Sequence, residues 1–288
     1  MSMTHDRIIE PSTSPVISLA GELDTSTDIN LAAGEQTRIL PKPRITRRYE
    51  IFKRLIDIVI ASIILLLASP IILLCSLIVR LTSPGPAIYT QVRLGRHRKP
   101  FVIYKMRSMY HDCERHSGIR WCTKNDSRIT PIGRFLRKSH IDELPQLWNV
   151  LRGDMSLIGP RPERPELVSS LQNLIPNYLE RLLVHPGLTG LAQIQLPPDA
   201  DIESVRKKLL VDCSYIDNLS FWLDCRIFIG TFFYLMGVPQ WKTRSMLKLP
   251  FPESLLTQHD RLNQISSELV TPPTSSRKHS DSQPKVTS

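Results

Sequence analysis

The sequence predicts a mainly helical α+β fold, namely a membrane-embedded, monotopic domain held by a re-entrant helical hairpin and interfacial amphipathic helices. Three observations predict it. An uncharged segment of 22 residues, 58–79, is long enough to reach across a bilayer core of roughly 30 Å. Two short apolar runs, 87–92 and 101–104, are typical of strands. Beyond these runs, apolar residues recur at helical spacing.

The two ends of the chain lack the composition of a packed core. Residues 1–46 are rich in Ser, Thr, Pro and Asp and show no helical or strand period. We therefore expect a flexible N-terminal extension (1–46), a domain over 47–240, and a largely flexible C-terminal extension (241–288). The first thirty residues contain no secretory signal pattern, so we expect the domain to stay on the cytoplasmic side.

The composition indicates anionic partners. The 37 Lys and Arg residues exceed the 27 Asp and Glu residues by ten, which suits lipid headgroups, phosphorylated substrates or nucleic acid. A nucleic-acid-binding protein would explain this charge but not the apolar segment, so no nucleic-acid partner is expected. The five cysteines show no C-x-x-C spacing, so neither a zinc site nor a disulfide framework is indicated.

The apolar segment contains the pair Ser69-Pro70 near its middle. Proline removes a backbone donor and disturbs the preceding helical turn. Hydropathy alone allows an ordinary transmembrane helix with a tolerated proline kink. Basic residues flank the segment on both sides, however, and by the positive-inside rule both ends then lie in the cytoplasm. This pattern favours a re-entrant membrane helix over 58–80 that breaks at Ser69 and Pro70.

Apolar residues at helical spacing predict further helices in the second half of the chain. These helices cover residues 132–136, 144–151 and 163–183, the last interrupted near Pro176. Residues 227–238 are apolar but too short to span a bilayer. Either a buried core helix or an interfacial helix fits this segment, and the flanking Trp222 and Trp241 suit contact with lipid headgroups.

A run of basic residues follows the apolar segment. Residues 80–107 contain seven Lys or Arg and no carboxylate. Such a run can hold anionic lipid, with about 1 kcal/mol for each basic residue near the surface. Lys105 and Arg107 are equally suited to recognising a phosphate. The residues alone leave both interpretations open.

Adjacent carboxylates, Asp142 and Glu143, follow a second basic stretch, 134–138. In the first turn of a helix, the positive end of the helix dipole stabilises carboxylates and phosphates alike. One carboxylate is suited to attack a phosphorus atom, and its neighbour to bind a divalent cation. Helix capping is the alternative explanation, and it is the more common role of such a pair.

Residues 153–162 have the composition of a rigid loop. Glycines allow the backbone to approach closely, and Pro160 and Pro162 restrict Arg161 on both sides. A guanidinium held in this way is suited to bidentate contact with phosphate. A structural turn with a surface arginine fits the same residues.

Taken in order, these segments resemble the bacterial sugar transferase family, the monotopic polyprenyl-phosphate phosphoglycosyl transferases. The resemblance extends from Lys53 to about Pro239. Its most specific blocks are Asp142–Leu147 (Asp-Glu-Leu-Pro-Gln-Leu) and Gly153–Pro162 (Gly-Asp-Met-Ser-Leu-Ile-Gly-Pro-Arg-Pro). The Ser69-Pro70 pair resembles the break in the re-entrant hairpin of the family.

The resemblance implies a role for each candidate residue. Asp142 matches the nucleophile that accepts the sugar phosphate, and Glu143 matches a catalytic residue associated with Mg²⁺. The remaining residues are implied to contact substrate: Lys105, Arg107 and Arg137 in the basic lining, Gln146, and Pro160, Arg161 and Pro162 in the nucleotide pocket.

The resemblance also implies a reaction and a place for it. A sugar phosphate passes from a UDP-sugar to polyprenyl (undecaprenyl) phosphate with release of UMP, which initiates assembly of an exopolysaccharide, capsule, O-antigen or glycoprotein glycan. The expected location is the bacterial cytoplasmic (inner) membrane, with the active site and both termini facing the cytoplasm. Anionic membrane lipid and glycan-assembly enzymes are further expected partners, and no residue pattern specifies the sugar or the oligomeric state. The alternative is a non-catalytic membrane scaffold for glycan-assembly enzymes, against which the intact Asp142-Glu143 pair argues.

Overall fold

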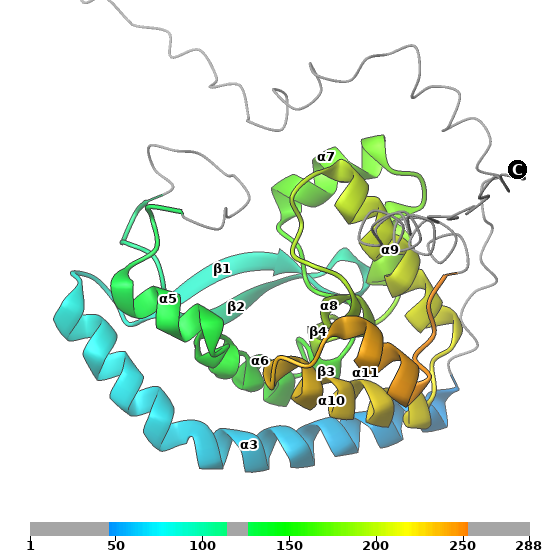
Figure 1. The fold of residues 1–288 in the computed structure, drawn as a ribbon, viewed down its shortest axis with the longest axis horizontal. Coiled ribbons are helices and arrows are strands. Elements are labelled where there is room, and N and C mark those ends of the chain that lie inside the picture. Colours follow the sequence, from blue (N-terminus) through cyan, green and yellow to red (C-terminus); the bar gives the residue numbers. More distant parts are fainter. Residues whose placement is uncertain (1–45, 114–125, 253–288) are drawn as a thin grey trace, which may run out of the picture. The chain divides into compact units, whose positions relative to one another are not determined.

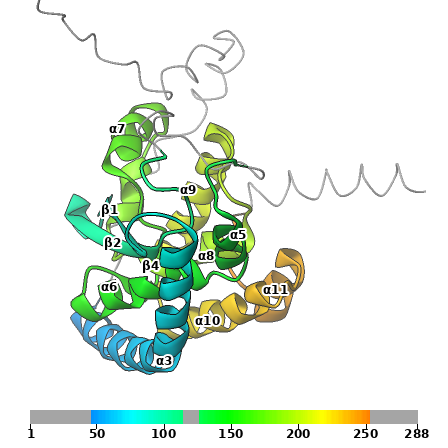
Figure 2. The ribbon, with the colours of Figure 1, turned by 90° about the vertical axis from the view of Figure 1, so that its left-hand side faces the viewer.

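The computed structural model describes residues 46–113 and 126–252, of which 46–250 belong to one compact unit. Helices surround two small two-stranded sheets (Figures 1 and 2). The prediction of a mainly helical fold is therefore confirmed. Of the flexible extensions predicted over residues 1–46 and 241–288, residues 1–45 and 253–288 lie outside the described residues.

The longest described element is helix α3, Arg47–Thr82, which contains the whole predicted membrane segment. Only a narrow stripe of this helix is buried, at Asp57, Ala61, Ala68, Cys75 and Val79. The other faces expose large apolar side chains, and those more than half exposed are Ile51, Leu55, Val59, Ile63, Leu66, Leu67, Leu73, Leu74, Leu77 and Leu81. Within the described ranges, α3 alone is long and apolar enough to cross a membrane.

The predicted break at Ser69 and Pro70 takes the form of a bend inside one continuous helix, visible in the blue-to-cyan helix of Figure 1. Pro70 has no N–H to donate to the carbonyl of Leu66, four residues earlier. The hydroxyl of Ser69 donates to that carbonyl instead, at 2.8 Å. The side chain before the proline thus replaces the missing backbone bond, and the helix continues.

The two apolar runs form the antiparallel ribbon β1 (Ile88–Leu94) and β2 (Pro100–Met106), in which Ile88 pairs with Met106. The two predicted strands are confirmed and are longer than predicted. The side chain of Asn149 bonds the edge of β2: its Nδ2 donates to the Val102 carbonyl at 2.7 Å, and its Oδ1 accepts from the Tyr104 N–H at 3.1 Å.

The helices predicted near residues 132–151 are present but differ in form. Helix α5 spans Pro131–Lys138, the 3₁₀ helix η2 spans Ile141–Gln146, and helix α6 spans Leu147–Arg152. Thr130 caps α5 by accepting a hydrogen bond from the Gly133 N–H at 3.0 Å. Pro145 lies inside the 3₁₀ helix and has no N–H to donate, so its position contributes no backbone hydrogen bond as a donor.

A second group of helices packs around an apolar core. These are helix α7 (Pro165–Leu174), the 3₁₀ helix η3 (Tyr178–Leu182) and helix α9 (Ile202–Asp217). The core consists of Val168, Leu171, Tyr178, Leu182, Val205, Leu209 and Cys213 from these helices, and of Ile175, which directly follows α7. The predicted interruption near Pro176 is confirmed, because Asn177 adopts the left-handed conformation between α7 and η3. Helix α9 was not predicted, although Asp201 and Ser204 form a capping box at its start.

Two short parallel strands form the second sheet. Strand β3 (Ser156–Ile158) pairs with β4 (Gly187–Thr189), and helix α8 (Leu191–Gln195) follows β4. Strand β3 lies inside the block 153–162, which was predicted as a rigid loop. Three-residue strands of this kind are too short to show an apolar alternation in sequence.

The last helices in the described part of the chain are α10 (Phe221–Leu235) and α11 (Gln240–Leu247). The apolar segment predicted at 227–238 is therefore helical as far as Leu235, and its helix begins earlier, at Phe221. Thr243 and Leu249 are buried at 1% and 6% exposure. The C-terminal extension predicted from residue 241 is therefore wrong for its first residues, because they pack onto the domain.

Helices α10 and α11 expose further large apolar side chains, namely Trp222, Phe228, Ile229, Phe232, Leu235, Met236, Trp241 and Met246. The rings of Phe52 on α3 and Phe221 on α10 meet edge to face, with centroids 5.3 Å apart. Figures 1 and 2 show α3, α10 and α11 along the same side of the domain. This side is too extensive and apolar to be explained by scattered surface residues.

Candidate functional site

Glycines hold the two parallel strands in close contact beside the candidate site. The Gly159 N–H donates to the Thr189 carbonyl at 3.0 Å, and the Gly187 N–H donates to the Pro160 carbonyl at 2.9 Å. A Cβ atom on Gly159 would lie 2.3 Å from the carbonyl oxygen of His185. Only glycine fits at this crossing, which fixes the start of the Pro160-Arg161-Pro162 loop.

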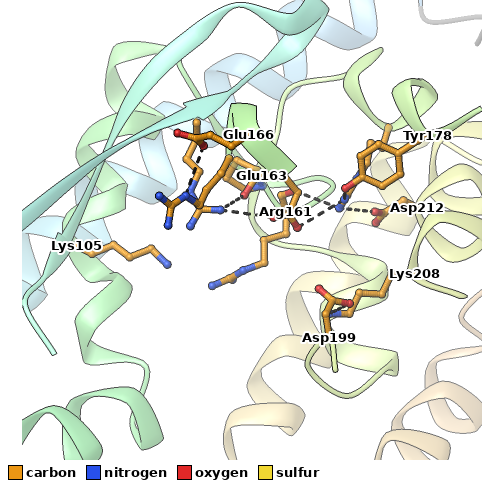
Figure 3. A network of polar contacts seen from close by, with 12 residues as sticks. Lys105, Arg161, Glu163, Glu166, Tyr178, Asp199, Lys208 and Asp212 are labelled. Carbon is orange, nitrogen blue, oxygen red and sulfur yellow. Dashed lines mark hydrogen bonds and ion pairs between the residues drawn. The ribbon is translucent and has the colours of Figure 1, made fainter. Parts of the chain in front are cut away.

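The structure brings Glu143 together with two basic residues from distant parts of the chain. The Lys105 Nζ on β2 lies 2.9 Å from Glu143 Oε1. Arg161 approaches the same carboxylate with both terminal nitrogens, Nη2 at 2.5 Å from Oε1 and Nη1 at 3.4 Å from Oε2. In Figure 3 the side chains of Lys105 and Arg161 point toward each other.

The buried side chain of Arg181 contacts the backbone of Arg161. Arg181 donates to the Arg161 carbonyl at 3.2 Å and to the Tyr178 hydroxyl at 2.8 Å. It also forms ion pairs with Asp212 at 2.9 Å and with Glu163 at 3.6 Å. Sequence reasoning missed this residue, because its partners come from three segments: the loop with Arg161 and Glu163, η3 with Tyr178, and α9 with Asp212.

Asp142 is placed next to Glu143 but has a different environment. It is 7% exposed, and its carboxylate forms no hydrogen bond or ion pair with any residue in the ranges 46–113 and 126–252. Successive residues of a 3₁₀ helix point about 120° apart, so the two carboxylates face different neighbours. Of the two carboxylates, Asp142 is therefore the one without a bonding partner among the described residues.

The two carboxyl groups differ in pKa as a result. Burial, and then the negative charge of Glu143, raise the pKa of Asp142 to about 6, although Lys105 and Arg137 oppose the rise. Burial alone would also raise the pKa of Glu143, but the charges of Arg161 and Lys105 outweigh it and hold that pKa well below its usual range. Neighbouring carboxyls with opposite shifts are typical of residues with different roles in a catalytic site.

The other predicted site residues are placed as follows. Arg137 Nε donates to the Ser108 hydroxyl at 2.8 Å, and its positive charge acts on Asp142. Gln146 is buried at 2% exposure, and its Nε2 has no hydrogen-bond partner among the described residues. Pro160 and Pro162 flank Arg161 in the loop after β3.

Arg107 has a different set of partners from the rest of the basic lining. Its guanidinium donates to the carbonyls of Pro84 and Ser83, both at 2.7 Å, and to that of Val79 at 3.2 Å. These acceptors lie at the C-terminal end of α3 and in the turn that follows. The hydrogen bonds of Arg107 thus stabilise the C-terminal end of α3 and the turn after it.

The fit of a magnesium ion depends on the donors present. No group of three or more His, Cys, Asp or Glu side chains suited to a metal occurs in residues 46–113 and 126–252. Mg²⁺, however, keeps several waters and usually binds one or two carboxylates together with substrate phosphates. Asp142 and Glu143 fit an ion that is shared with a diphosphate.

Comparison with known proteins gives a consistent result. Residues 48–237 match the profile of the family described as "Bacterial sugar transferase". A protein of Caulobacter vibrioides, named UDP-glucose:undecaprenyl-phosphate glucose-1-phosphate transferase, is 38% identical over 221 residues, which are 74% of this chain and 82% of the relative.

Two longer relatives are also similar to this chain. A UDP-N-acetylgalactosamine-undecaprenyl-phosphate N-acetylgalactosaminephosphotransferase of Aeromonas hydrophila is 43% identical over 193 residues, 67% of this chain and 44% of the relative. A UDP-glucose:undecaprenyl-phosphate glucose-1-phosphate transferase of Klebsiella pneumoniae is 44% identical over 185 residues, 64% of this chain and 40% of the relative. The chain thus spans less than half the length of these two proteins.

Proposed function

This chain belongs to the bacterial sugar transferase family, and we propose that it transfers a sugar phosphate from a UDP-sugar to a polyprenyl phosphate. The observation that carries the proposal is the contrast between the adjacent carboxyls. Asp142 is buried and has no hydrogen-bond or ion-pair partner among the described residues, whereas Glu143 is bonded by Lys105 and Arg161. The names of relatives that act on UDP-sugars and undecaprenyl phosphate support the same conclusion.

In the first step, a carboxylate oxygen of Asp142 attacks the phosphorus that carries the sugar. A new oxygen–phosphorus bond forms, the bond to the bridging oxygen of the diphosphate breaks, and UMP leaves with that oxygen. The product is a sugar phosphate linked to Asp142 as a mixed anhydride. With a pKa of about 6, Asp142 is mostly ionised at neutral pH and ready to attack.

Basic residues offset the negative charge that gathers at the phosphorus. Lys105 and Arg161 already converge on Glu143, and the positive charge of Arg137 acts on Asp142. Preorganised cations of this kind stabilise a transferring phosphoryl group without reorganising during the reaction. We expect the buried amide nitrogen of Gln146, which lacks a partner among the described residues, to donate to the substrate.

In the second step, a phosphate oxygen of the polyprenyl phosphate attacks the same phosphorus. The bond to Asp142 breaks, its carboxylate is restored, and the sugar becomes attached to the lipid through a diphosphate. Asp142 is therefore needed in both steps, first as the nucleophile and then as the leaving group.

The proposed membrane arrangement follows from the apolar helix α3 and from the basic residues on both sides of its apolar segment. The helix enters the bilayer from the cytoplasmic side, bends at Ser69 and Pro70, and returns to the same side. The exposed apolar faces of α3, α10 and α11 support this embedding, and basic residues at both ends of the apolar segment favour a cytoplasmic position for each end. The active site then faces the cytoplasm, where UDP-sugars occur.

We include a magnesium ion in the proposal. It would be held by Glu143, with Asp142 nearby, and by the oxygens of the diphosphate, whose negative charge it would neutralise. Because the ion would take over part of the charge of Glu143, Lys105 and Arg161 would bind Glu143 less strongly and could contact the phosphates.

The proposal is tested by mass spectrometry of the purified protein in detergent, given Mg²⁺ and pooled UDP-sugars without lipid. We expect the peptide that contains Asp142 to gain the mass of one sugar phosphate, with UMP released in a single turnover. Polyprenyl phosphate should remove the added mass and sustain turnover. Asp142→Asn should abolish the adduct and UMP release, whereas Glu166→Gln, at an exposed carboxylate of α7, should abolish neither.

Turnover without any adduct, or UMP release that survives Asp142→Asn, would refute the covalent mechanism. A folded protein that releases no UMP from a broad panel of UDP-sugars would favour the scaffold alternative.

A further inference from the structure

Two arginine side chains hold the backbone of the loop that carries Arg161. Arg181 donates to the Arg161 carbonyl, as described above, and Arg93 Nη1 donates to the Pro162 carbonyl at 3.1 Å. Both donors are well buried, since the side chain of Arg181 is 4% exposed and that of Arg93 is 17% exposed. These bonds fix the two peptide groups that follow Arg161, and therefore the direction in which its side chain leaves the loop.

Glu163, in the same loop, pairs with both of these arginines. Its Oε2 lies 3.5 Å from Arg93 Nη1, and its Oε1 lies 3.6 Å from Arg181 Nη1. Its own carbonyl accepts from the Leu94 N–H at 2.9 Å, which fixes the position of its backbone. The mechanism described above assigns no role to this carboxylate.

The charge of Glu163 also offsets the repulsion among the arginines around the loop. Burial lowers the pKa of Arg93, and the charge of Glu163 is the strongest influence that opposes this shift. The positive charges of Arg161 and Arg164 act on Arg93 in the same direction as burial. The charge of Glu143 raises the pKa of Arg161 most, and Glu163 adds to this rise.

The pairing of Glu163 joins the loop to the β1–β2 ribbon. Arg93 belongs to β1, and β1 is paired along its length with β2, which carries Lys105. Lys105 and Arg161 both contact Glu143, one from the ribbon and one from the loop. The ion pair between Arg93 and Glu163 therefore helps to set the position of these two cations relative to each other.

We propose that Glu163 is a positioning residue that orients Arg161 toward the diphosphate of the UDP-sugar, an inference that rests on the proposed function. The carboxylate pairs with Arg93 and Arg181 at once and so keeps both donors in place behind the loop. Its loss leaves two buried positive charges less well compensated. A small displacement of a phosphate-binding group is enough to slow a transfer reaction, because catalysis requires the groups close to their productive geometry.

A double-mutant cycle tests whether Glu163 acts through Arg161. Glu163→Gln keeps the size of the side chain and removes its charge. With saturating UDP-sugar and Mg²⁺ in detergent, we expect single-turnover UMP release to slow about tenfold. In the Arg161→Ala background the same change should slow release less than about twofold, because the group that it positions is absent.

Glu166→Gln is the matched control for this cycle. It removes an exposed carboxylate of α7 and should leave the rate unchanged in both backgrounds. Equal slowing by Glu163→Gln in both backgrounds would mean that Glu163 only stabilises the fold or acts on the substrate by another route. That result would overturn the inference.

A second variant covers the case in which Glu163→Gln does not fold. Glu163→Asp keeps the negative charge, but its shorter side chain cannot pair with Arg93 and Arg181 together. Its thermal unfolding in detergent should stay close to that of wild type, whereas UMP release should slow about threefold or more, again only when Arg161 is present. A folded Glu163→Asp protein with the wild-type rate would show that the double pairing is not needed, and the inference would be wrong.

The same measurements separate the inference from the proposed function. Absence of Asp142-dependent UMP release in wild type would refute the proposed function, and the inference with it. Asp142-dependent release in wild type, combined with an effect of Glu163→Gln that does not depend on Arg161, would overturn the inference alone.

Discussion

Asp142 and Glu143 are consecutive residues of one 3₁₀ turn, yet only Glu143 is paired with cations. Glu143 accepts from Lys105 and Arg161, whereas the Asp142 carboxylate has no partner among the described residues. The paired carboxylate stays ionised over the physiological range, and its charge helps to keep the pKa of its neighbour high. This asymmetry is consistent with the proposed roles of Asp142 as the nucleophile and of Glu143 as the residue that would hold the metal ion.

The pH dependence of the first step should follow the ionisation of Asp142. Because its pKa is raised to about 6, kcat/KM for the UDP-sugar should rise with pH through this value and level off above it. At pH 5 the value should be about tenfold below the plateau, since kcat/KM reports the free enzyme. Glu143→Gln removes a negative charge and should move this acidic limb to lower pH in whatever activity remains. A limb that stays in place would contradict the proposed coupling.

Asp142 should also destabilise the folded protein when it is ionised. Its folded pKa lies above the ordinary aspartate value of 3.8, so the folded state binds more protons than the unfolded state between pH 3.8 and 6. Stability is therefore lost as pH rises through this window. Asp142→Asn should be more stable than wild type at pH 7, by up to about 3 kcal/mol. The gain should vanish below pH 4, which thermal unfolding in detergent at several pH values would detect.

Arg161→Lys should weaken the site although it keeps the charge. Lysine cannot reproduce the two-pronged contact with Glu143, and kcat/KM should fall by about 10- to 100-fold. Arg206→Lys, at an exposed position of α9, is the matched control and should leave kcat/KM unchanged. A conservative change at Arg161 with no effect on kcat/KM would show that its fork geometry is unimportant.

Much of this site was predictable because its residues belong to short, specific sequence blocks. Asp142 and Glu143 occur in one block and Arg161 in the next, so their resemblance to the family located them. Which of Lys105 and Arg107 reaches Glu143 could not be predicted, since both are basic and they lie only two residues apart, at the end of β2 and just after it. The structure separates them through their partners: Arg107 binds carbonyls at the end of α3, and Lys105 binds Glu143.

The parts of the fold that were not predicted depend on contacts between distant segments. Helix α9 carries Asp212 and several core residues, but its mixed polar and apolar sequence gives only a weak helical pattern. Strands β3 and β4 have three residues each and are defined by their pairing with each other. The C-terminal boundary was placed too early because Thr243 is polar yet fully buried in the packed structure.

Gly159→Ala should disrupt the pairing of β3 and β4. The added Cβ would lie 2.3 Å from the His185 carbonyl oxygen and 2.9 Å from the Gly187 nitrogen, and both obstacles are backbone. We expect a loss of about 1–3 kcal/mol or more in the free energy of unfolding, because the strands must separate. Gly237→Ala meets no atom within 4 Å and carries only the strain of its positive φ of 76°. It should cost less, and equal losses in chemical unfolding would argue against a steric cause.

The hydroxyl of Ser69 should stabilise α3 only because Pro70 is present. Ser69→Ala leaves the Leu66 carbonyl without its donor, at a cost of about 1 kcal/mol. Pro70→Ala restores the backbone N–H that bonds this carbonyl, so Ser69→Ala should cost almost nothing in that background. Detergent unfolding of the four proteins gives the coupling directly, with Ser76→Ala as a control elsewhere in the helix. If Ser69→Ala costs the same with and without Pro70, the hydroxyl does not replace the missing backbone bond, and the bend in α3 has another cause.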